Sequence, residues 1–164
     1  MEVSLTGRSA VITGGSKGLG LAMATQFAAS GANVAILARR PDVLDAAVEK
    51  IKAGAVGQII GISCDVGAAG QTAAAMERIK GAFGQVDILV NNAGESRVGM
   101  FEDITDEMWH ADIDQKLMGA IRMTRLVWGE MKERGWGRII NVLSINAKSQ
   151  RAGGAPTTVS RAAG

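Results

Sequence analysis

The stretch Thr13-Gly14-Gly15-Ser16-Lys17-Gly18-Leu19-Gly20 decides the fold of this chain. Before it comes Ser9-Ala10-Val11-Ile12-Thr13, a short, uncharged run of the kind found in buried parallel strands. After it, apolar residues recur at helical spacing, namely Leu21, Ala22, Ala24, Phe27 and Ala28. A strand, a glycine turn and a helix N-terminus bring unpaired backbone N–H groups and the positive end of a helix dipole to one point. The stretch therefore predicts a cradle for a pyrophosphate.

The glycines of this turn have separate tasks. In such turns one glycine permits a backbone path closed to side chains, one lets the ligand approach the main chain, and one lets the helix pack on the strand. The spacing of Gly14, Gly18 and Gly20 differs from the commoner G-x-G-x-x-G, but the mechanics are the same. A P-loop would need a Ser or Thr after its lysine, whereas Gly18 follows Lys17, so we set that interpretation aside. An ordinary glycine-rich loop remains the alternative.

The composition predicts a single soluble domain over residues 1–164. Hydrophobic residues make up 47% of the chain, which excludes disorder, and no apolar run is long enough to span a bilayer. Residues 1–6 lead almost directly into the first strand and leave no room for a secretory leader. We therefore expect a cytoplasmic protein that does not bind membranes.

Charge and cysteine content argue against two further classes of protein. The net charge of +2 is spread along the chain and aromatic residues make up only 4%, so the footprint of a nucleic-acid binder is missing. Cys64 is the only cysteine and His110 the only histidine, so we expect neither a disulfide nor a metal site. Cys64 is interpreted as a core residue, and a small molecule is the expected partner.

A second buried run, residues 34–38, ends at Arg39. In dinucleotide-binding units the residue at this strand end, about 20 positions past the glycines, faces the adenosine ribose. An acidic residue there bonds the 2′-hydroxyl, whereas an arginine suits a 2′-phosphate. Lys17 adds a second cation, as charge-assisted phosphate recognition requires. Arg39 and Lys17 therefore predict NADP(H) as the cofactor, with a plain surface arginine as the alternative.

Strands and helices alternate through the rest of the chain. We expect strands at 58–62, 86–90 and 138–143, and helices beginning at Pro41, over 68–83 and over 105–134. Asp65 follows the third strand, where it could accept a hydrogen bond from an adenine amino group or simply cap a helix. The alternation predicts an α/β fold with a doubly wound parallel sheet and ligands at the carboxyl edge of its strands.

Three motifs resemble the short-chain dehydrogenase/reductase family: residues 13–20, Cys64-Asp65-Val66 and Asn91-Asn92-Ala93-Gly94. The resemblance covers the whole chain. It implies a Rossmann sheet of order 3-2-1-4-5, a nicotinamide cofactor, a catalytic Ser-Tyr-Lys set helped by an Asn, and usually a homotetramer. The cofactor-binding residues that it implies are Thr13, Gly14, Ser16, Lys17, Gly18, Leu19, Gly20, Arg39, Asp65, Val66, Asn91, Ala93 and Gly94.

The catalytic positions depart from the family pattern. Ser144 matches the family's serine, but Lys116 stands at the position of its Asn, and Thr157 and Arg161 stand at those of its Tyr and Lys. The chain contains no tyrosine at all. Two classes of function stay open. One is an NADP(H)-dependent oxidoreductase, acting on a carbonyl/alcohol pair or on an activated C=C bond, and the other is a dinucleotide-binding sensor or scaffold without hydride transfer.

Lys116 is the candidate proton donor of an active enzyme. A threonine hydroxyl does not ionise near neutral pH and Arg161 is permanently charged, whereas burial beside Arg161 should lower the pKa of Lys116 from about 10.4 toward neutrality. In this hypothesis Ser144 and Thr157 hold the substrate oxygen and Arg161 holds the cofactor ribose. The alternative is that both cations only anchor cofactor phosphate or subunit contacts.

Two further expectations concern the C-terminal half. Residues 105–134 should form one long helix whose apolar band is too wide for the sheet alone to cover, so a second subunit should contact it in a homo-oligomer, either a dimer or a tetramer. In a chain that stops at Gly164, no further strand would pair with the fifth strand, whose outer backbone N–H and C=O groups would remain exposed. We therefore expect the sequence to be part of a longer protein, truncated after that strand.

Overall fold

A computed structural model describes residues 3–149 and 152–164. No secretory leader is expected in residues 1–6, and the first two of these, Met1 and Glu2, lie outside the described residues. Five parallel strands form the main sheet, in the order β3-β2-β1-β4-β6. They are β1 (Ser9–Thr13), β2 (Asn33–Ala38), β3 (Ile59–Ser63), β4 (Ile88–Asn91) and β6 (Arg138–Asn141). The predicted doubly wound sheet of order 3-2-1-4-5 is confirmed, with β6 as the fifth long strand.

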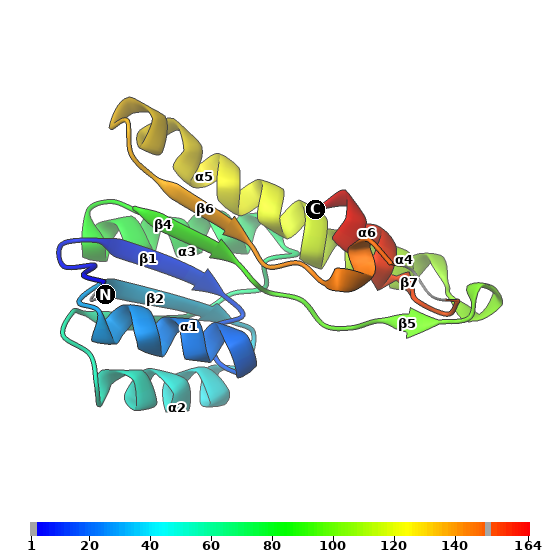
Figure 1. Cartoon of the computed structure of the whole chain (residues 1–164), viewed down its shortest axis with the longest axis horizontal. Helices are drawn as coiled ribbons and strands as arrows, with labels where there is room; N and C mark the ends of the chain where they lie inside the picture. Colours follow the sequence, from blue (N-terminus) through cyan, green and yellow to red (C-terminus); the bar gives the residue numbers. More distant parts are fainter. Residues whose placement is uncertain (1–2, 150–151) are drawn as a thin grey trace.

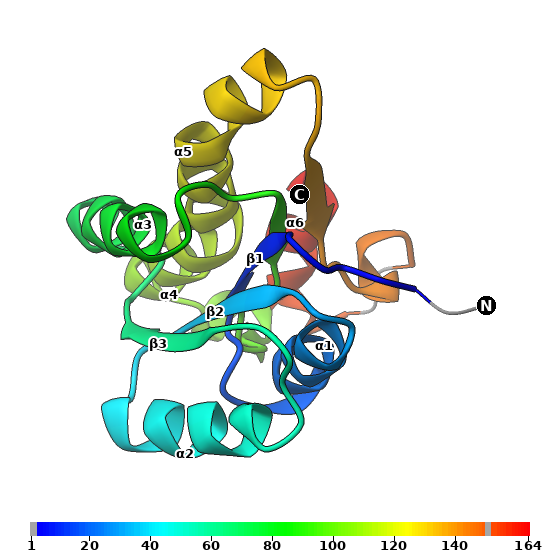
Figure 2. The ribbon, with the colours of Figure 1, turned by 90° about the vertical axis from the view of Figure 1, so that its left-hand side faces the viewer.

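Helices cover both faces of this sheet (Figure 2). On one face lie α1 (Gly18–Ala29) and α2 (Pro41–Lys52), and on the other lie α3 (Ala69–Phe83) and α5 (Gly119–Glu133). Alternate residues of β1 point to opposite faces, since Ile12 packs in the core beneath α1 and α2 and Val11 in the core beneath α3 and α5. Burial on both sides explains why β1, β2 and β4 are nearly continuous apolar runs, whereas the edge strand β6 is mostly exposed. None of the helices in the described ranges is both long and apolar enough to cross a membrane.

The helix expected over residues 105–134 is not uniform. It consists of α4 (Asp106–Ile113), a π-helical turn (Asp114–Met118) and then α5. Its predicted start is confirmed, because the Thr105 hydroxyl accepts a hydrogen bond from the Met108 amide. A π turn holds more residues than an α turn, so it rotates the faces of α5 relative to those of α4. The predicted long helix is therefore confirmed, but it contains a π-helical turn that the sequence pattern did not show, and this turn carries Lys116.

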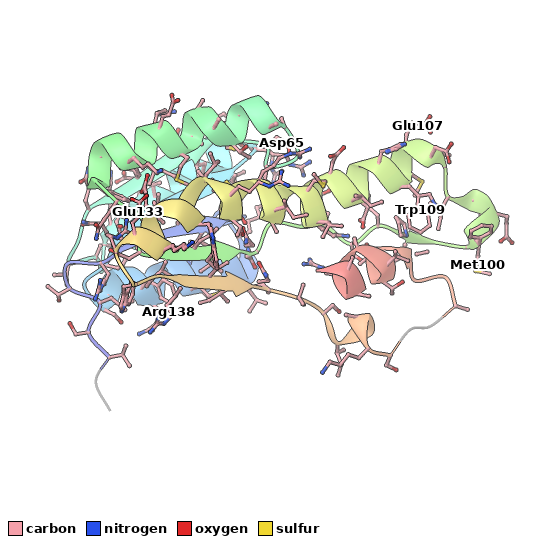
Figure 3. All side chains as sticks on the ribbon, turned by 90° about the horizontal axis from the view of Figure 1, so that it is seen from above. Asp65, Met100, Glu107, Trp109, Glu133 and Arg138 are labelled. Atoms are coloured by element: carbon pink, nitrogen blue, oxygen red, sulfur yellow. The ribbon has the colours of Figure 1, made fainter. Side chains whose placement is uncertain are left out.

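Beyond the carboxyl ends of the long strands the chain forms a small second layer (Figure 1). The two short strands β5 (Val98–Gly99) and β7 (Ala155–Pro156) pair antiparallel beside α4 and α6 (Thr157–Ala163). Met100 lies at the outer end of this layer, and Glu133 and Arg138 lie at the opposite end of the molecule (Figure 3). The sequence pattern did not predict β5 and β7, because two residues carry no periodicity. This layer places α6 and the π turn next to the strand ends.

Candidate functional site

A cleft of about 650 Å³ opens at the carboxyl edge of the sheet, where β1 leads into α1. Eleven of the thirteen predicted cofactor-binding residues line it: Gly14, Ser16, Lys17, Gly18, Leu19, Gly20, Arg39, Asp65, Val66, Ala93 and Gly94. The other two, Thr13 and Asn91, line a neighbouring cavity of about 380 Å³. The structure therefore brings together residues that lie far apart in the sequence. Arg40, Asn92 and Glu95 also line the cleft, although the sequence pattern did not single them out.

The glycine turn has the conformation that the spacing predicts. The backbone at Gly14 has a φ of +66° and at Gly18 a φ of +52°, values that favour glycine. At Gly20 an added Cβ would lie 2.2 Å from the Gly14 carbonyl oxygen, so only glycine lets α1 pack this closely on the turn. The first turn of α1 has no side-chain cap and no acidic residue. Its N–H groups, beside the cleft, suit an anionic ligand.

Side chains from β1 and from the segment after β4 brace this turn. Asn92 Nδ2 donates to the carbonyl oxygens of Thr13 at 2.9 Å and Gly14 at 3.3 Å. Thr13 Oγ1 accepts from the backbone N–H groups of Asn92 and Ala93, both at 2.9 Å. Asn91 Nδ2 donates to Asn141 Oδ1 at 2.9 Å, which links β4 to β6. In this structure Thr13 and Asn91 hold the strand ends together rather than line the cleft itself.

Four cations line the cleft, namely Lys17, Arg39, Arg40 and Arg161. The Arg39 guanidinium donates to the Glu95 carboxylate in an ion pair whose two side chains are 46% and 55% exposed. Glu95 also lies 3.6 Å from Arg97, between its Oε2 and the Arg97 Nη2. The predicted phosphate-binding arginine is therefore already in contact with an internal anion.

Asp65 lies beside the start of α3 (Figure 3). Its Oδ1 accepts from the Gly67 amide at 2.9 Å, whereas the N-cap position of α3 is Ala68. The alternative role of helix N-cap is therefore wrong, and the half-buried carboxylate lines the cleft instead. Cys64 is buried as expected, and burial together with the Asp65 charge raises the pKa of its thiol to about 11. That thiol stays protonated at neutral pH, which makes it a poor nucleophile.

A buried polar network centred on Asp112 joins two of the four candidate catalytic residues. The fully buried Asp112 carboxylate accepts from the Lys116 ammonium, from Thr157 Oγ1 at 3.2 Å and from Ser160 Oγ at 2.5 Å. Lys116 Nζ also donates to Thr157 Oγ1 at 2.6 Å. The sequence pattern did not single out Asp112, although a carboxylate four residues before a lysine on a helix was a usable signal.

The Thr157 hydroxyl is fully used by these contacts. It accepts from Lys116 and from the Arg97 backbone N–H at 2.8 Å, and it donates to Asp112. A hydroxyl offers one proton and two lone pairs, so nothing is left for a substrate oxygen. Thr157 also lines neither cavity. In this structure the Thr157 hydroxyl therefore belongs to the buried network, and its contact with a substrate stays a prediction.

Ser144 and Arg161 lie near the end of β6. Ser144 is half-buried in the segment that follows this strand and, like Thr157, lines neither cavity. Arg161, from α6, lines both cavities and donates from Nη1 to the Val142 carbonyl oxygen at 2.7 Å. An added Cβ at Gly94 would lie 2.7 Å from Arg161 Nη2, so the guanidinium packs against the Gly94 backbone at the cleft wall. Arg161 thus lies where it can contact a ligand in the cleft.

Lys116 lines the smaller cavity together with Ser160 and Arg161. The pKa of Lys116 lies below its ordinary value, and the largest cause is burial. The charges of Arg161 and Arg97 also lower this pKa. The hydrogen bond to Asp112 and the charge of Asp112 act in the opposite direction and raise it. The predicted direction is confirmed, and of its two predicted causes burial is larger than the charge of Arg161. The opposing Asp112 charge was not foreseen.

The chain resembles known proteins over nearly its whole length. A family model described as short chain dehydrogenase matches residues 8–164. The acetoacetyl-CoA reductase of Rhizobium meliloti (strain 1021) is 37% identical over 149 residues, which cover 89% of this chain and 58% of that protein. The D-beta-hydroxybutyrate dehydrogenase of Cupriavidus necator is 38% identical over 145 residues, covering 87% of this chain and 55% of that protein. The chain therefore spans somewhat more than half the length of these relatives.

Solved structures show the same fold. The L-sorbose reductase of Gluconobacter frateurii, complexed with NADPH and L-sorbose, matches with a TM-score of 0.95 and 34% identity, over 99% of this chain and 62% of that chain. A metagenomic short-chain oxidoreductase in complex with NADP matches with a TM-score of 0.92 and 32% identity, over 97% of this chain and 72% of that chain.

Proposed function

This chain belongs to the short chain dehydrogenase family, and we propose that it is an NADP(H)-dependent oxidoreductase that transfers hydride between the cofactor and a small carbonyl or alcohol substrate. The observation that carries the proposal is the cleft at the glycine turn, where the N–H groups of α1 meet Lys17, Arg39 and Arg40. The reductase and dehydrogenase among the relatives support the reaction class. The neighbours solved with NADPH and NADP support the cofactor.

The lining of the cleft fits the parts of such a cofactor. The backbone of the glycine turn and the start of α1 would hold the pyrophosphate, and Lys17 and Arg39 the 2′-phosphate. Asp65 would accept from the adenine amino group, with Val66 beside it. The ribose of the nicotinamide half would lie against Ala93, Gly94 and Arg161. When bound, the reduced cofactor supplies the hydride, and Ser144 and Lys116 are the groups that we propose to bond and protonate the substrate oxygen.

The choice of cofactor should depend on Arg39. A charge-assisted hydrogen bond contributes about 1.5–3 kcal/mol, so the chain should prefer NADPH over NADH by roughly tenfold to a hundredfold. Arg39→Asp should abolish this preference, because a carboxylate repels a 2′-phosphate and suits a 2′-hydroxyl. Fluorescence titration of both cofactors measures it. The control is Arg78→Asp, at an exposed position of α3 outside the cleft, and an unchanged preference in Arg39→Asp would rule out the assignment.

A specific observation favours a second candidate function, a dinucleotide-binding sensor without hydride transfer. The Lys116 ammonium, the Thr157 hydroxyl and the Arg161 guanidinium each bond to protein groups. The two candidates separate when NADPH consumption is followed with a panel of ketoses, β-keto thioesters and enones. Oxidation with any ketose or β-keto thioester supports the carbonyl reductase, oxidation with enones alone supports a reductase of activated C=C bonds, and tight binding without oxidation supports the sensor.

We also propose that the chain forms a homo-oligomer, a dimer or a tetramer, through residues 105–134. Val127 of α5 is buried against the sheet, but its neighbour Trp128 is 59% exposed, and Leu143 beyond β6 is 48% exposed. Light scattering at micromolar concentration should give the mass of at least two chains. Trp128→Glu should lower that mass toward the monomer by placing a charge in the contact, whereas a wild-type protein that is already monomeric would contradict the proposal.

A further inference from the structure

The ion pair between Arg39 and Glu95 crosses the carboxyl edge of the sheet. Arg39 directly follows β2, and Glu95 lies four residues beyond the end of β4. In the sheet β1 lies between these two strands. The pair therefore bridges the end of β1, where the glycine turn begins, and both side chains line the cleft.

Glu95 offers Arg39 the same kind of partner that a phosphate would. Carboxylate and phosphate oxygens both match the planar fork of a guanidinium. While Glu95 holds Arg39, those N–H groups are not available to a ligand, and a carboxylate at this place would also repel a phosphate. Because both side chains are about half exposed, the pair contributes little stability and a stronger anion can displace it.

Arg97 provides Glu95 with a second partner. Its Nη2 lies 3.6 Å from Glu95 Oε2, while its Nη1 donates to Gln115 Oε1 at 2.9 Å. Arg97 is also the less exposed of the two arginines, at 23% against 46%. A Glu95 carboxylate that leaves Arg39 therefore keeps a positively charged neighbour held in place by another side chain.

We propose that Glu95 is a specificity-determining residue that competes with the 2′-phosphate of NADP(H) for Arg39. In the ligand-free chain the Glu95 carboxylate binds the Arg39 guanidinium at the place where the phosphate would bind. When the phosphate binds, it replaces that carboxylate, and Glu95 turns to Arg97. This inference rests on the proposed NADP(H) site and adds a residue that lowers the affinity for 2′-phosphorylated ligands alone.

The test compares two nucleotides, 2′,5′-ADP and 5′-AMP, which differ only in the 2′-phosphate. Calorimetric titrations of the chain are made at an ionic strength of about 0.01 M, where screening of exposed charges is weak. Glu95→Gln, which removes the charge and keeps the size, should bind 2′,5′-ADP about two- to fivefold more tightly, and 5′-AMP should be unaffected. Salt of about 1 M should remove most of the difference. The matched control is Glu77→Gln on α3, an exposed carboxylate outside the cleft that should change neither affinity.

The outcomes separate this inference from the proposed function. If wild-type protein prefers 2′,5′-ADP and Glu95→Gln does not tighten its binding, the inference is overturned and the NADP(H) site stands. If Glu95→Gln tightens both nucleotides equally, Glu95 only obstructs the cleft, and the inference is again overturned. If wild-type protein binds the two nucleotides equally, or binds neither, both the inference and the phosphate site fail.

Discussion

Asp112→Asn should lower the free energy of unfolding by about 3–5 kcal/mol, because it leaves the Lys116 ammonium without its counter-ion in a buried place. The side chains of Asp112 and Lys116 are 0% and 1% exposed, so the charge that is left behind has little access to bulk solvent. Lys116→Met should cost less, since the Asp112 carboxylate keeps its hydrogen bonds from Thr157 and Ser160 and has the Arg97 guanidinium 3.8 Å away. Urea unfolding of the two variants and the wild-type protein measures both values.

A double-mutant cycle shows whether the two charges act as a pair. Asp112→Asn combined with Lys116→Met should cost much less than the sum of the single changes, because no charge is then left buried alone. The exposed pair Glu49 and Lys52 on α2 is the control, and the same kinds of substitution there should change stability by less than about 1 kcal/mol. Additive costs at the buried positions would show that Asp112 and Lys116 do not depend on each other.

The double variant should also lose turnover if Lys116 gives the substrate its proton. General acid catalysis contributes roughly 10² to 10⁴ in rate, and Lys116 is the titratable side chain with a lowered pKa that lines the smaller cavity and can release a proton. Methionine cannot donate a proton, whereas the cleft residues that we assign to NADPH are unchanged. We therefore expect kcat in the reductive direction to fall by at least about a hundredfold while the affinity for NADPH stays close to that of the wild-type protein.

The pH dependence of the wild-type enzyme gives a second check on Lys116. Only the protonated amine can donate, so the rate of reduction should fall as the pH rises through the pKa of Lys116. Since burial lowers that pKa, the fall should begin below the ordinary lysine value of about 10.4. Turnover of the double variant within about twofold of the wild-type rate, with this pH dependence unchanged, would exclude Lys116 as the donor.

The sequence was sufficient for the sheet and the glycine turn, because both follow from local rules. Strands buried on both faces give apolar runs, and positions such as Gly14 and Gly20 follow from a backbone that side chains would obstruct. The π turn was not predictable, since hydrophobic periodicity does not show where one turn of a helix holds an extra residue. Its discovery matters because Lys116 lies in it.

The polar contacts of the site were harder to predict for a different reason. Glu95 meets Arg39 across 56 positions of sequence, and Thr157 meets Lys116 across 41, so these pairs exist only once the sheet and the small second layer are assembled. The residue type of Thr157 likewise did not show that its hydroxyl bonds to Arg97, Lys116 and Asp112. Residue types at family positions predict where a side chain lies better than they predict which partners it has.

Titration of the wild-type chain with NADPH and with NADH tests the central claim most directly, because it needs neither a substrate nor a variant. NADPH is expected to bind roughly tenfold to a hundredfold more tightly than NADH, as the charge-assisted bonds from Arg39 and Lys17 to a 2′-phosphate require. Equal affinity for the two cofactors, or no binding of either, would contradict the NADP(H) site at the glycine turn.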